Sequence, residues 1–248
     1  MKKIIIIGAS SGIGRALACH YHREGYNVGV TARRVQRLKE LASSLGEPRM
    51  TYRFMDVADL ENSAAVFKEL VQSMGGCDIV IYNAGVDSGG GNWNAASDLK
   101  TISINSLGVV AIAHASIEHF RASGGGHFVC ISSIAGLRGN GRSPAYSASK
   151  AMVSNYLAGI RQRLLGSSIA VTDIRPGYVM TEMIKDRSKA FWAATPEKAA
   201  SQIASAIQKK KKMAYVTHRW GIIAFLIPMI PQCLYDWGFK KYFLKKNA

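Results

Sequence analysis

The first fifteen residues constrain the fold most strongly. Lys3 to Ile7 form a short apolar run, which is typical of a buried parallel strand. A glycine-rich turn follows at once, and a helical pattern of apolar residues continues from it. In such a turn, backbone N–H groups can approach a diphosphate at the positive N-terminus of the helix. The glycines alone could mark only a tight turn, but strand and helix supply the context for a nucleotide site. Its candidate residues are Gly8, Ser10, Ser11, Gly12, Ile13 and Gly14.

The second predicted strand, residues 26–32, ends in Arg33 and Arg34. A dinucleotide with a free ribose 2′-hydroxyl usually meets an acidic residue near this point. None occurs here between Glu24 and Glu40. Guanidinium groups match phosphate oxygens, so the two arginines favour NADP(H) over NAD(H). The alternative is a solvated basic start to the next helix.

Strand and helix patterns alternate along the 248 residues, which predicts a doubly wound α/β sheet in one domain. Thr195, Pro196 and Glu197 form a typical helix start, with a capping hydroxyl and an early proline. We expect residues 1–212 to form the nucleotide-binding catalytic domain and residues 213–248 a basic and apolar C-terminal segment. Helical patterns cover residues 35–45, 59–74, 97–122, 145–165 and 196–210.

Tyr146 and Lys150 are four residues apart in a helical pattern, which places them on one face. A nearby cation favours a phenolate, so the lysine is expected to lower the pKa of the tyrosine. Taken alone the pair is weak evidence, because many helices carry Tyr and Lys at this spacing.

With the motifs that follow, the chain resembles the short-chain dehydrogenase/reductase family over about residues 3–181. Ser133 precedes Tyr146 by thirteen residues, the family's spacing for its catalytic serine. Tyr82 departs from the family's frequent Asn-Asn-Ala-Gly, and we expect it to affect local packing more than mechanism. The other matching positions are Asp56-Val57, Asn83-Ala84-Gly85, Asn105 and the loop from Pro176 to Thr181.

The resemblance implies a Rossmann-type fold, a three-layer α/β/α arrangement of about seven parallel strands in the order 3-2-1-4-5-6-7. It makes Tyr146 the proton donor, Ser133 the group that orients the carbonyl oxygen, and Lys150 the residue that lowers the tyrosine pKa and holds the nicotinamide ribose. Asn105 would anchor a water linked to Lys150. Ser133 as a turn cap and Asn105 as a packed amide are the structural alternatives. The implied cofactor contacts beyond the glycine turn and the arginines are Asp56, Val57, Asn83, Ala84, Gly85, Tyr146, Lys150, Pro176, Gly177, Val179 and Thr181.

Four scattered cysteines form no paired motif, and six histidines show no metal-ligand spacing. We therefore expect a reducing compartment, no disulfide and no metal. The apolar run after Met1 is too short for a secretion signal and leads directly into the glycine turn. These features predict a cytoplasmic protein.

The C-terminal forty residues carry nine lysines and arginines against one aspartate, a net +8 of the chain's formal +16. Trp220 to Tyr235 is uncharged but contains Pro228 and Pro231, so it is too short and interrupted to span a bilayer. One hypothesis is peripheral contact with the inner membrane face. The other is packing over the substrate cleft or an oligomer interface, with the run from Lys209 to Lys212 complementing a helix end. No base-reading motif accompanies the charge, so we expect no nucleic acid.

These features lead to an NADPH-dependent carbonyl reductase acting on a hydrophobic or lipid-like ketone. Arg138 and Arg142, in the loop before Tyr146, could bind an anionic group of the substrate. Residues 183–192 lie where family members carry a lid. The alternatives are a 3-oxoacyl-(acyl carrier protein) reductase and a non-catalytic NADPH-binding regulator. By resemblance we expect a homodimer or homotetramer.

Overall fold

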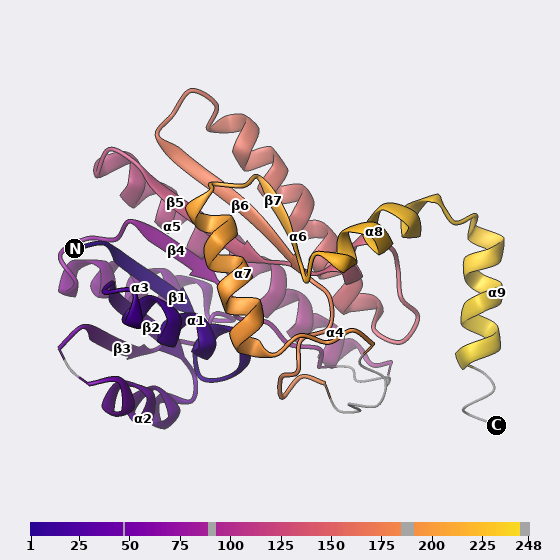
Figure 1. Ribbon diagram of the computed structural model, residues 1–248, viewed down its shortest axis with the longest axis horizontal. Helices are drawn as coiled ribbons and strands as arrows, with labels where there is room; N and C mark the ends of the chain where they lie inside the picture. The colour runs from indigo at the N-terminus through magenta and orange to yellow at the C-terminus, as the bar shows by residue number, and fades with distance from the viewer. Residues whose placement is uncertain (47, 89–92, 185–190, 244–248) are drawn as a thin grey trace.

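Seven parallel strands form one sheet in the order β3-β2-β1-β4-β5-β6-β7, which confirms the predicted fold class and strand order. The computed structural model describes residues 1–46, 48–88, 93–184 and 191–243 (Figure 1). The strands are β1 (Lys3–Ile7), β2 (Asn27–Ala32), β3 (Met50–Phe54), β4 (Ile79–Tyr82), β5 (Gly126–Ile131), β6 (Ile169–Pro176) and β7 (Met213–Val216).

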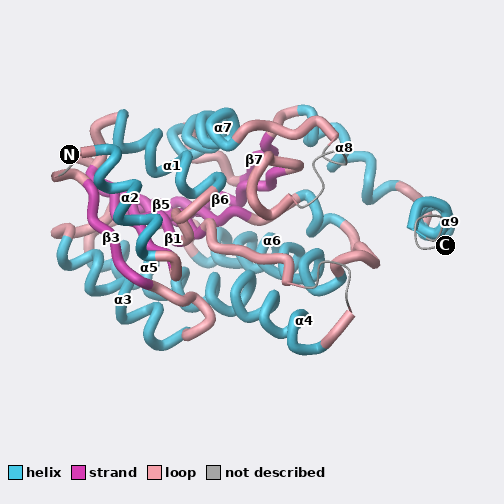
Figure 2. Tube along the Cα trace, turned by 90° about the horizontal axis from the view of Figure 1, so that it is seen from below, coloured by secondary structure: helices cyan, strands magenta, loops and turns pink. Residues whose placement is uncertain are grey.

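Helices cover both faces of the sheet and make three layers (Figure 2). One face carries α1 (Gly12–Arg23), α2 (Val35–Leu45) and α7 (Pro196–Gln208). The other carries α3 (Leu60–Ser73), α5 (Gly108–Ala122) and α6 (Pro144–Arg163), with α4 (Ala95–Ile102) packed against α6.

The apolar run of β1 divides between the two layers. Ile4 and Ile6 pack with α1, α2 and α7, whereas Ile5 and Ile7 pack with α3, α5 and α6. All four side chains are fully buried. Because both faces of this central strand are covered, the sequence shows a continuous apolar run instead of alternation.

The helix predicted over residues 97–122 is divided by a π-helical turn, Ser103–Leu107, between α4 and α5. Such a turn is a single irregular turn inside a helix that continues on both sides, so the pattern predicted one helix where the structure has three segments. The hydroxyl of Tyr82 donates to the Ile104 carbonyl at 2.6 Å, and a Cβ on Gly108 would lie 2.4 Å from that hydroxyl. Tyr82 therefore acts in local packing, as predicted. Residues 95–122 have the length and hydropathy of a membrane span, but most of the stretch is buried within this body.

The chain leaves the sheet through β7 and ends in a C-terminal arm, residues 219–243. The arm consists of α8 (Arg219–Leu226), a 3₁₀ turn (Ile227–Met229) and α9 (Gln232–Phe243), and it extends away from the body (Figure 1). The predicted boundary after residue 212 falls immediately before β7, so the C-terminal segment begins with a strand of the sheet. Lys245 and Lys246 lie outside the described residues.

Candidate active site

A cleft of about 1340 Å³ lies where the carboxyl ends of the strands meet the loops that follow them. All the predicted site residues line it except Gly14 and Asn105, which lie directly behind its wall. The structure therefore brings together side chains from the ends of β1, β2, β4, β5 and β6 and from the start of α6.

Close backbone packing explains the glycines of the turn after β1. Gly8 has a φ of +89°, and a Cβ there would lie 2.7 Å from Ala84 Cα. Asn83 Nδ2 donates to the Gly8 carbonyl at 2.7 Å, and a Cβ on Gly14 would lie 2.2 Å from that carbonyl oxygen. The glycine turn is thus packed against the Asn83-Ala84-Gly85 motif, and this packing leaves no room for a side chain at Gly8 or Gly14.

The start of α1 fits a phosphate-bearing cofactor. Ser11 is the N-cap residue, yet its hydroxyl makes no capping bond, and the first turn of α1 contains no acidic residue. Backbone N–H groups at such an end are available to an anion. Asp56 and Val57 line the same cleft beyond β3, and the Asp56 carboxylate accepts a bond from the Ala58 N–H at 3.1 Å. Together these groups match the parts of a dinucleotide.

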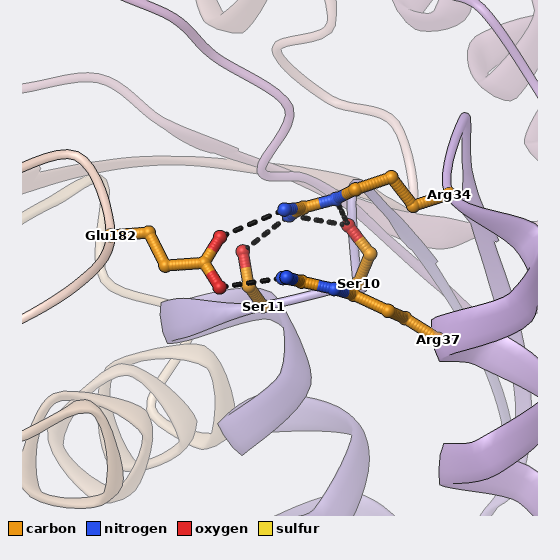
Figure 3. Close-up of polar contacts among 5 residues, drawn as sticks. All are labelled: Ser10, Ser11, Arg34, Arg37 and Glu182. Carbon is orange, nitrogen blue, oxygen red and sulfur yellow. Dashed lines mark hydrogen bonds and ion pairs between the residues drawn. The ribbon is translucent and has the colours of Figure 1, made fainter.

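Arg34 joins the glycine turn to the segment that follows β6 (Figure 3). Its guanidinium donates to the hydroxyls of Ser10, at 2.9 Å, and Ser11, at 2.7 Å. It also pairs with Glu182 at 2.8 Å, and Arg37 pairs with the other carboxylate oxygen at 2.5 Å. Hydrogen bonds from the two arginines lower the pKa of Glu182 to about 2. Arg33 is exposed and lines the cleft.

Sequence reasoning missed Glu182 and Arg37. The partners of Glu182 are 148 and 145 residues away, so no local pattern connects them. The one usable signal was position, because Glu182 directly follows Thr181 in the predicted cofactor loop.

Ser133, Tyr146 and Lys150 converge within the same cleft. Pro144 begins α6 and places Tyr146 in the first turn of that helix. Ser133 follows β5 and accepts the Ala135 N–H at 3.1 Å, and its hydroxyl lies close enough to the Tyr146 hydroxyl to lower the pKa of that phenol. Lys150 Nζ lies 5.8 Å from the centre of the Tyr146 ring and donates to the Ile131 carbonyl at 2.8 Å.

The expected lowering of the Tyr146 pKa is wrong for the chain by itself. Burial raises this pKa, the hydroxyl of Ser133 opposes that rise, and the charge of Asp87 adds to it. Burial also lowers the pKa of Lys150, against the opposing effect of Cys130 and Asp173. The prediction considered the lysine charge but not the desolvation of both partners, which is the largest effect on each. The buried phenol therefore holds its proton at neutral pH.

Asn105 occupies the π-helical turn and fixes the strand-end loop after β4. Its side-chain amide donates to the Val86 carbonyl and accepts the Val86 N–H, both at 2.8 Å, and it donates to Ser149 Oγ at 3.1 Å. A Cβ on Gly85 would lie 3.4 Å from Asn105 Oδ1 and 3.5 Å from Lys150 Nζ. The amide and the ammonium thus both lie beside Gly85.

Aromatic and apolar side chains line one part of the cleft. Tyr178 and Trp220 meet edge to face at 5.6 Å, and a Cβ on Gly177 would lie 2.2 Å from the Trp220 ring. Phe191 stacks on Trp192 at 4.3 Å, and both approach Trp220. These two residues end the predicted lid, of which residues 185–190 lie outside the described part of the chain. Trp220 Nε1 is buried and has no hydrogen-bond partner among the described residues.

Two polar groups at this end differ from expectation. Arg138 was expected to greet an anionic substrate, but it donates to the Ile227 carbonyl at 3.1 Å and to Gln232 Oε1 at 2.7 Å, and lies over the Tyr235 ring at 4.4 Å. It therefore holds the C-terminal arm. Asp87, which the sequence analysis missed, accepts the Ser143 hydroxyl at 2.7 Å inside the cleft. Arg142 lines the cleft as well.

Comparison with known proteins agrees with this geometry. The family model described as short chain dehydrogenase matches residues 2–191. An uncharacterized oxidoreductase of Mycobacterium tuberculosis is 31% identical over 93% of this chain and 94% of its own length. Hydroxysteroid 11-beta-dehydrogenase 1-like protein A of Xenopus laevis is 30% identical over 95% of this chain and 82% of its own. The solved closed form of serine dehydrogenase with NADP⁺ is 25% identical, with a TM-score of 0.78, over 86% of this chain and 94% of that one. The chain therefore belongs to the short-chain dehydrogenase/reductase family.

Proposed function

We propose that the protein is an NADPH-dependent reductase that converts the carbonyl of an apolar ketone to an alcohol. The approach of the Ser133 hydroxyl to the protonated phenol of Tyr146, inside one cleft, carries this proposal. It places a proton donor and a second hydroxyl beside one spot at the carboxyl edge of the sheet, within the same cleft as the glycine turn.

Each polar side chain has a distinct task in the reduction. NADPH supplies the hydride when it is bound. Tyr146 holds a proton at its phenol oxygen and delivers it to the carbonyl oxygen as negative charge develops there. Ser133 orients that oxygen and stabilises its charge by a hydrogen bond that strengthens during the reaction. Lys150 places a cation near the ring of Tyr146, which favours the phenolate left after proton transfer.

The preference for NADP(H) rests on Arg34 and Arg33 at the end of β2. Arg34 already binds two hydroxyls of the phosphate turn, so its guanidinium is oriented where the adenosine ribose of a dinucleotide would lie. A planar guanidinium suits a 2′-phosphate. The serine dehydrogenase of similar structure was solved with NADP⁺, which supports the same choice here.

The apolar character of the substrate rests on the aromatic and apolar part of the cleft lining. Tyr178, Trp220, Ile227 and Tyr235 belong to it, and Arg138, which also lines the cleft, is engaged by the arm. An apolar ligand that covers such a surface removes apolar area from water on both sides, which favours its binding. The name of the Xenopus relative, a hydroxysteroid dehydrogenase-like protein, is consistent with a substrate of this class.

Oxidation of NADPH, followed by absorbance, tests the proposal with a steroid ketone, a long-chain alkanone, a short polar ketone and a 3-oxoacyl thioester of acyl carrier protein. We expect turnover with the apolar ketones, loss of it in Ser133→Ala, and weaker turnover with NADH. Turnover of the carrier thioester alone would favour the carrier-protein reductase. NADPH binding without turnover of any ketone would favour the regulator.

We also propose that the chain forms a homo-oligomer through α4, α5 and α6. Leu99 and Ile102 on α4, Leu107 on the π-helical turn before α5, and Met152 on α6 are exposed apolar side chains. Exposed apolar side chains that cluster on helices often mark an interface, and an interface between copies of the chain would bury them. Light scattering coupled to gel filtration should give a multiple of 26.9 kDa for the native chain and a smaller mass for Leu107→Lys. A monomeric native chain would refute this proposal.

A further inference from the structure

The C-terminal arm has one side that contacts the body and another that does not. On α9, Tyr235 donates its hydroxyl to the Gly139 carbonyl at 3.0 Å, and Phe239 lies against Gly141. On α8, Trp220 and Ala224 are buried. Within each helix these residues are four apart, so they lie on one side, which we call the inner face of the arm. The inner face attaches the arm to the body, and the remaining side chains are not needed for that contact.

The opposite side of the arm is apolar and exposed. On α8 and the turn after it, exposed apolar residues occur at spacings of three and four, and α9 continues with two more at a spacing of three. Phe225 is 70% exposed and Trp237 is 63% exposed. We call this surface the outer face of the arm; it comprises Ile222, Phe225, Leu226, Met229, Ile230, Leu234 and Trp237. Clusters of large exposed apolar side chains on one element mark an interaction site.

Charge around the outer face suits an anionic partner. Lys241 Nζ lies 5.0 Å from the Trp237 ring, Lys240 is adjacent, and Asp236 is bonded to Gln232 at 2.8 Å. The run from Lys209 to Lys212 is not part of this surface, because it precedes β7 whereas the arm follows that strand. Among its described residues the arm carries Arg219, Lys240 and Lys241 against Asp236, and the chain as a whole has a formal charge of +16, so the charge favours an anionic surface as the occupant.

We propose that the outer face of the arm binds an anionic lipid surface and lies in its interface. The helices before and after Pro231 are bent by 113° relative to each other, and the inner face is fastened to the loop holding Arg138 and Gly139. The arm is therefore positioned to lie on a membrane with its aromatic and aliphatic side chains inserted. Basic residues beside an apolar stripe are the usual composition of such interfacial helices.

Flotation of the full chain with lipid vesicles tests the proposal. Vesicles of phosphatidylcholine mixed with phosphatidylglycerol should carry the native protein upward, and added salt should reduce this. Phe225→Ser combined with Trp237→Ser should lower the partition coefficient by roughly tenfold or more, because each change removes a large inserted side chain. Leu165→Ser is the matched control, since Leu165 is 78% exposed but lies after α6, away from the arm, and it should change nothing.

A second variant separates charge from insertion. Lys240→Gln with Lys241→Gln should weaken binding to the anionic vesicles several-fold and leave the weaker binding to pure phosphatidylcholine unchanged. Circular dichroism on each variant confirms that it is folded. Failure of the native chain to float, or equal flotation of the serine variant, overturns the proposal. So does a smaller oligomer mass for that variant without lipid, which would make the outer face an interface between copies.

Discussion

Glu182 Oε2 lies 2.8 Å from Arg34 Nη1, so a carboxylate holds the guanidinium that we assign to the 2′-phosphate of the cofactor. Its other oxygen holds Arg37. The same Arg34 contacts Ser10 and Ser11, which connects the segment after β6 to the glycine turn (Figure 3). A 2′-phosphate and Glu182 therefore compete for one cation.

Glu182→Gln should tighten NADPH binding. The substitution removes a negative charge that both occupies Arg34 and repels a 2′-phosphate, while glutamine retains the size and a hydrogen-bond acceptor. We expect the dissociation constant for NADPH to fall by about two- to fivefold, the range for an exposed ion pair. That for NADH should not change. Titration calorimetry with both dinucleotides measures the difference.

Arg34→Ala is the opposite control and should weaken NADPH roughly tenfold or more relative to NADH. Equal weakening of both dinucleotides by Glu182→Gln would show that the carboxylate supports the fold of the turn instead of competing with the phosphate.

Tyr146→Phe should remove turnover while the fold and NADPH binding persist. The change deletes the hydroxyl that lies near Ser133 and keeps the half-buried ring, and loss of a positioned proton donor costs about 10²- to 10⁴-fold in rate. Tyr156→Phe on the same helix is the matched control and should retain native activity. If Tyr146→Phe keeps turnover within about tenfold of the native rate, another group is the acid.

The fold was predictable because its determinants are local. A continuous apolar run at Lys3–Ile7 requires cover on both faces, and the glycines after it admit only a strand–turn–helix unit. The order of motifs along the chain then placed Ser133 and Tyr146 at one edge of the sheet, where the structure has them.

What the sequence did not reveal depends on distant contacts. Arg138 reads as a solvated loop cation until Ile227 and Gln232, about ninety residues later, are seen to bind it. The raised pKa of Tyr146 needs the burial of the whole cleft wall, which spacing does not report. The π-helical turn at Asn105 is a single irregular turn between two α-helical segments, and a sequence read at the level of whole helices does not resolve it.

Asn105→Ala should destabilise the protein and reduce turnover together. Asn105 is fully buried and makes two bonds to the half-buried backbone of Val86, so its removal loses both bonds, at about 0.5–1.5 kcal/mol each. Urea unfolding monitored by circular dichroism measures the loss. Ser106→Ala in the same turn is the control, because its hydroxyl makes a single long bond of 3.4 Å, and it should cost under about 1 kcal/mol. If Asn105→Ala loses no more stability than Ser106→Ala, the bonds from Asn105 to Val86 do not stabilise the fold.

His127 should make the protein less stable as the pH falls below neutrality. It is buried on β5, and burial, aided by the charge of Lys210, lowers its pKa from 6.5 to about 4. Thr172 gives its hydroxyl proton to the Lys211 carbonyl, so neutral His127 donates from Nε2 to the Thr172 oxygen at 2.8 Å. Between pH 6.5 and 4 the unfolded chain binds the extra proton at this residue and the folded chain does not.

The free energy of unfolding therefore decreases with falling pH across that window, by about 1.4 kcal/mol per pH unit and about 3 kcal/mol in total from this residue. Urea unfolding at pH 7, 6 and 5 measures the slope. In His127→Gln, whose amide can still donate to Thr172, the slope should be smaller by that amount, because all other titrating groups are unchanged. Equal slopes in the two proteins would mean that His127 takes up its proton in the folded state, through an opening of β5 and β6 that the packed sheet does not show.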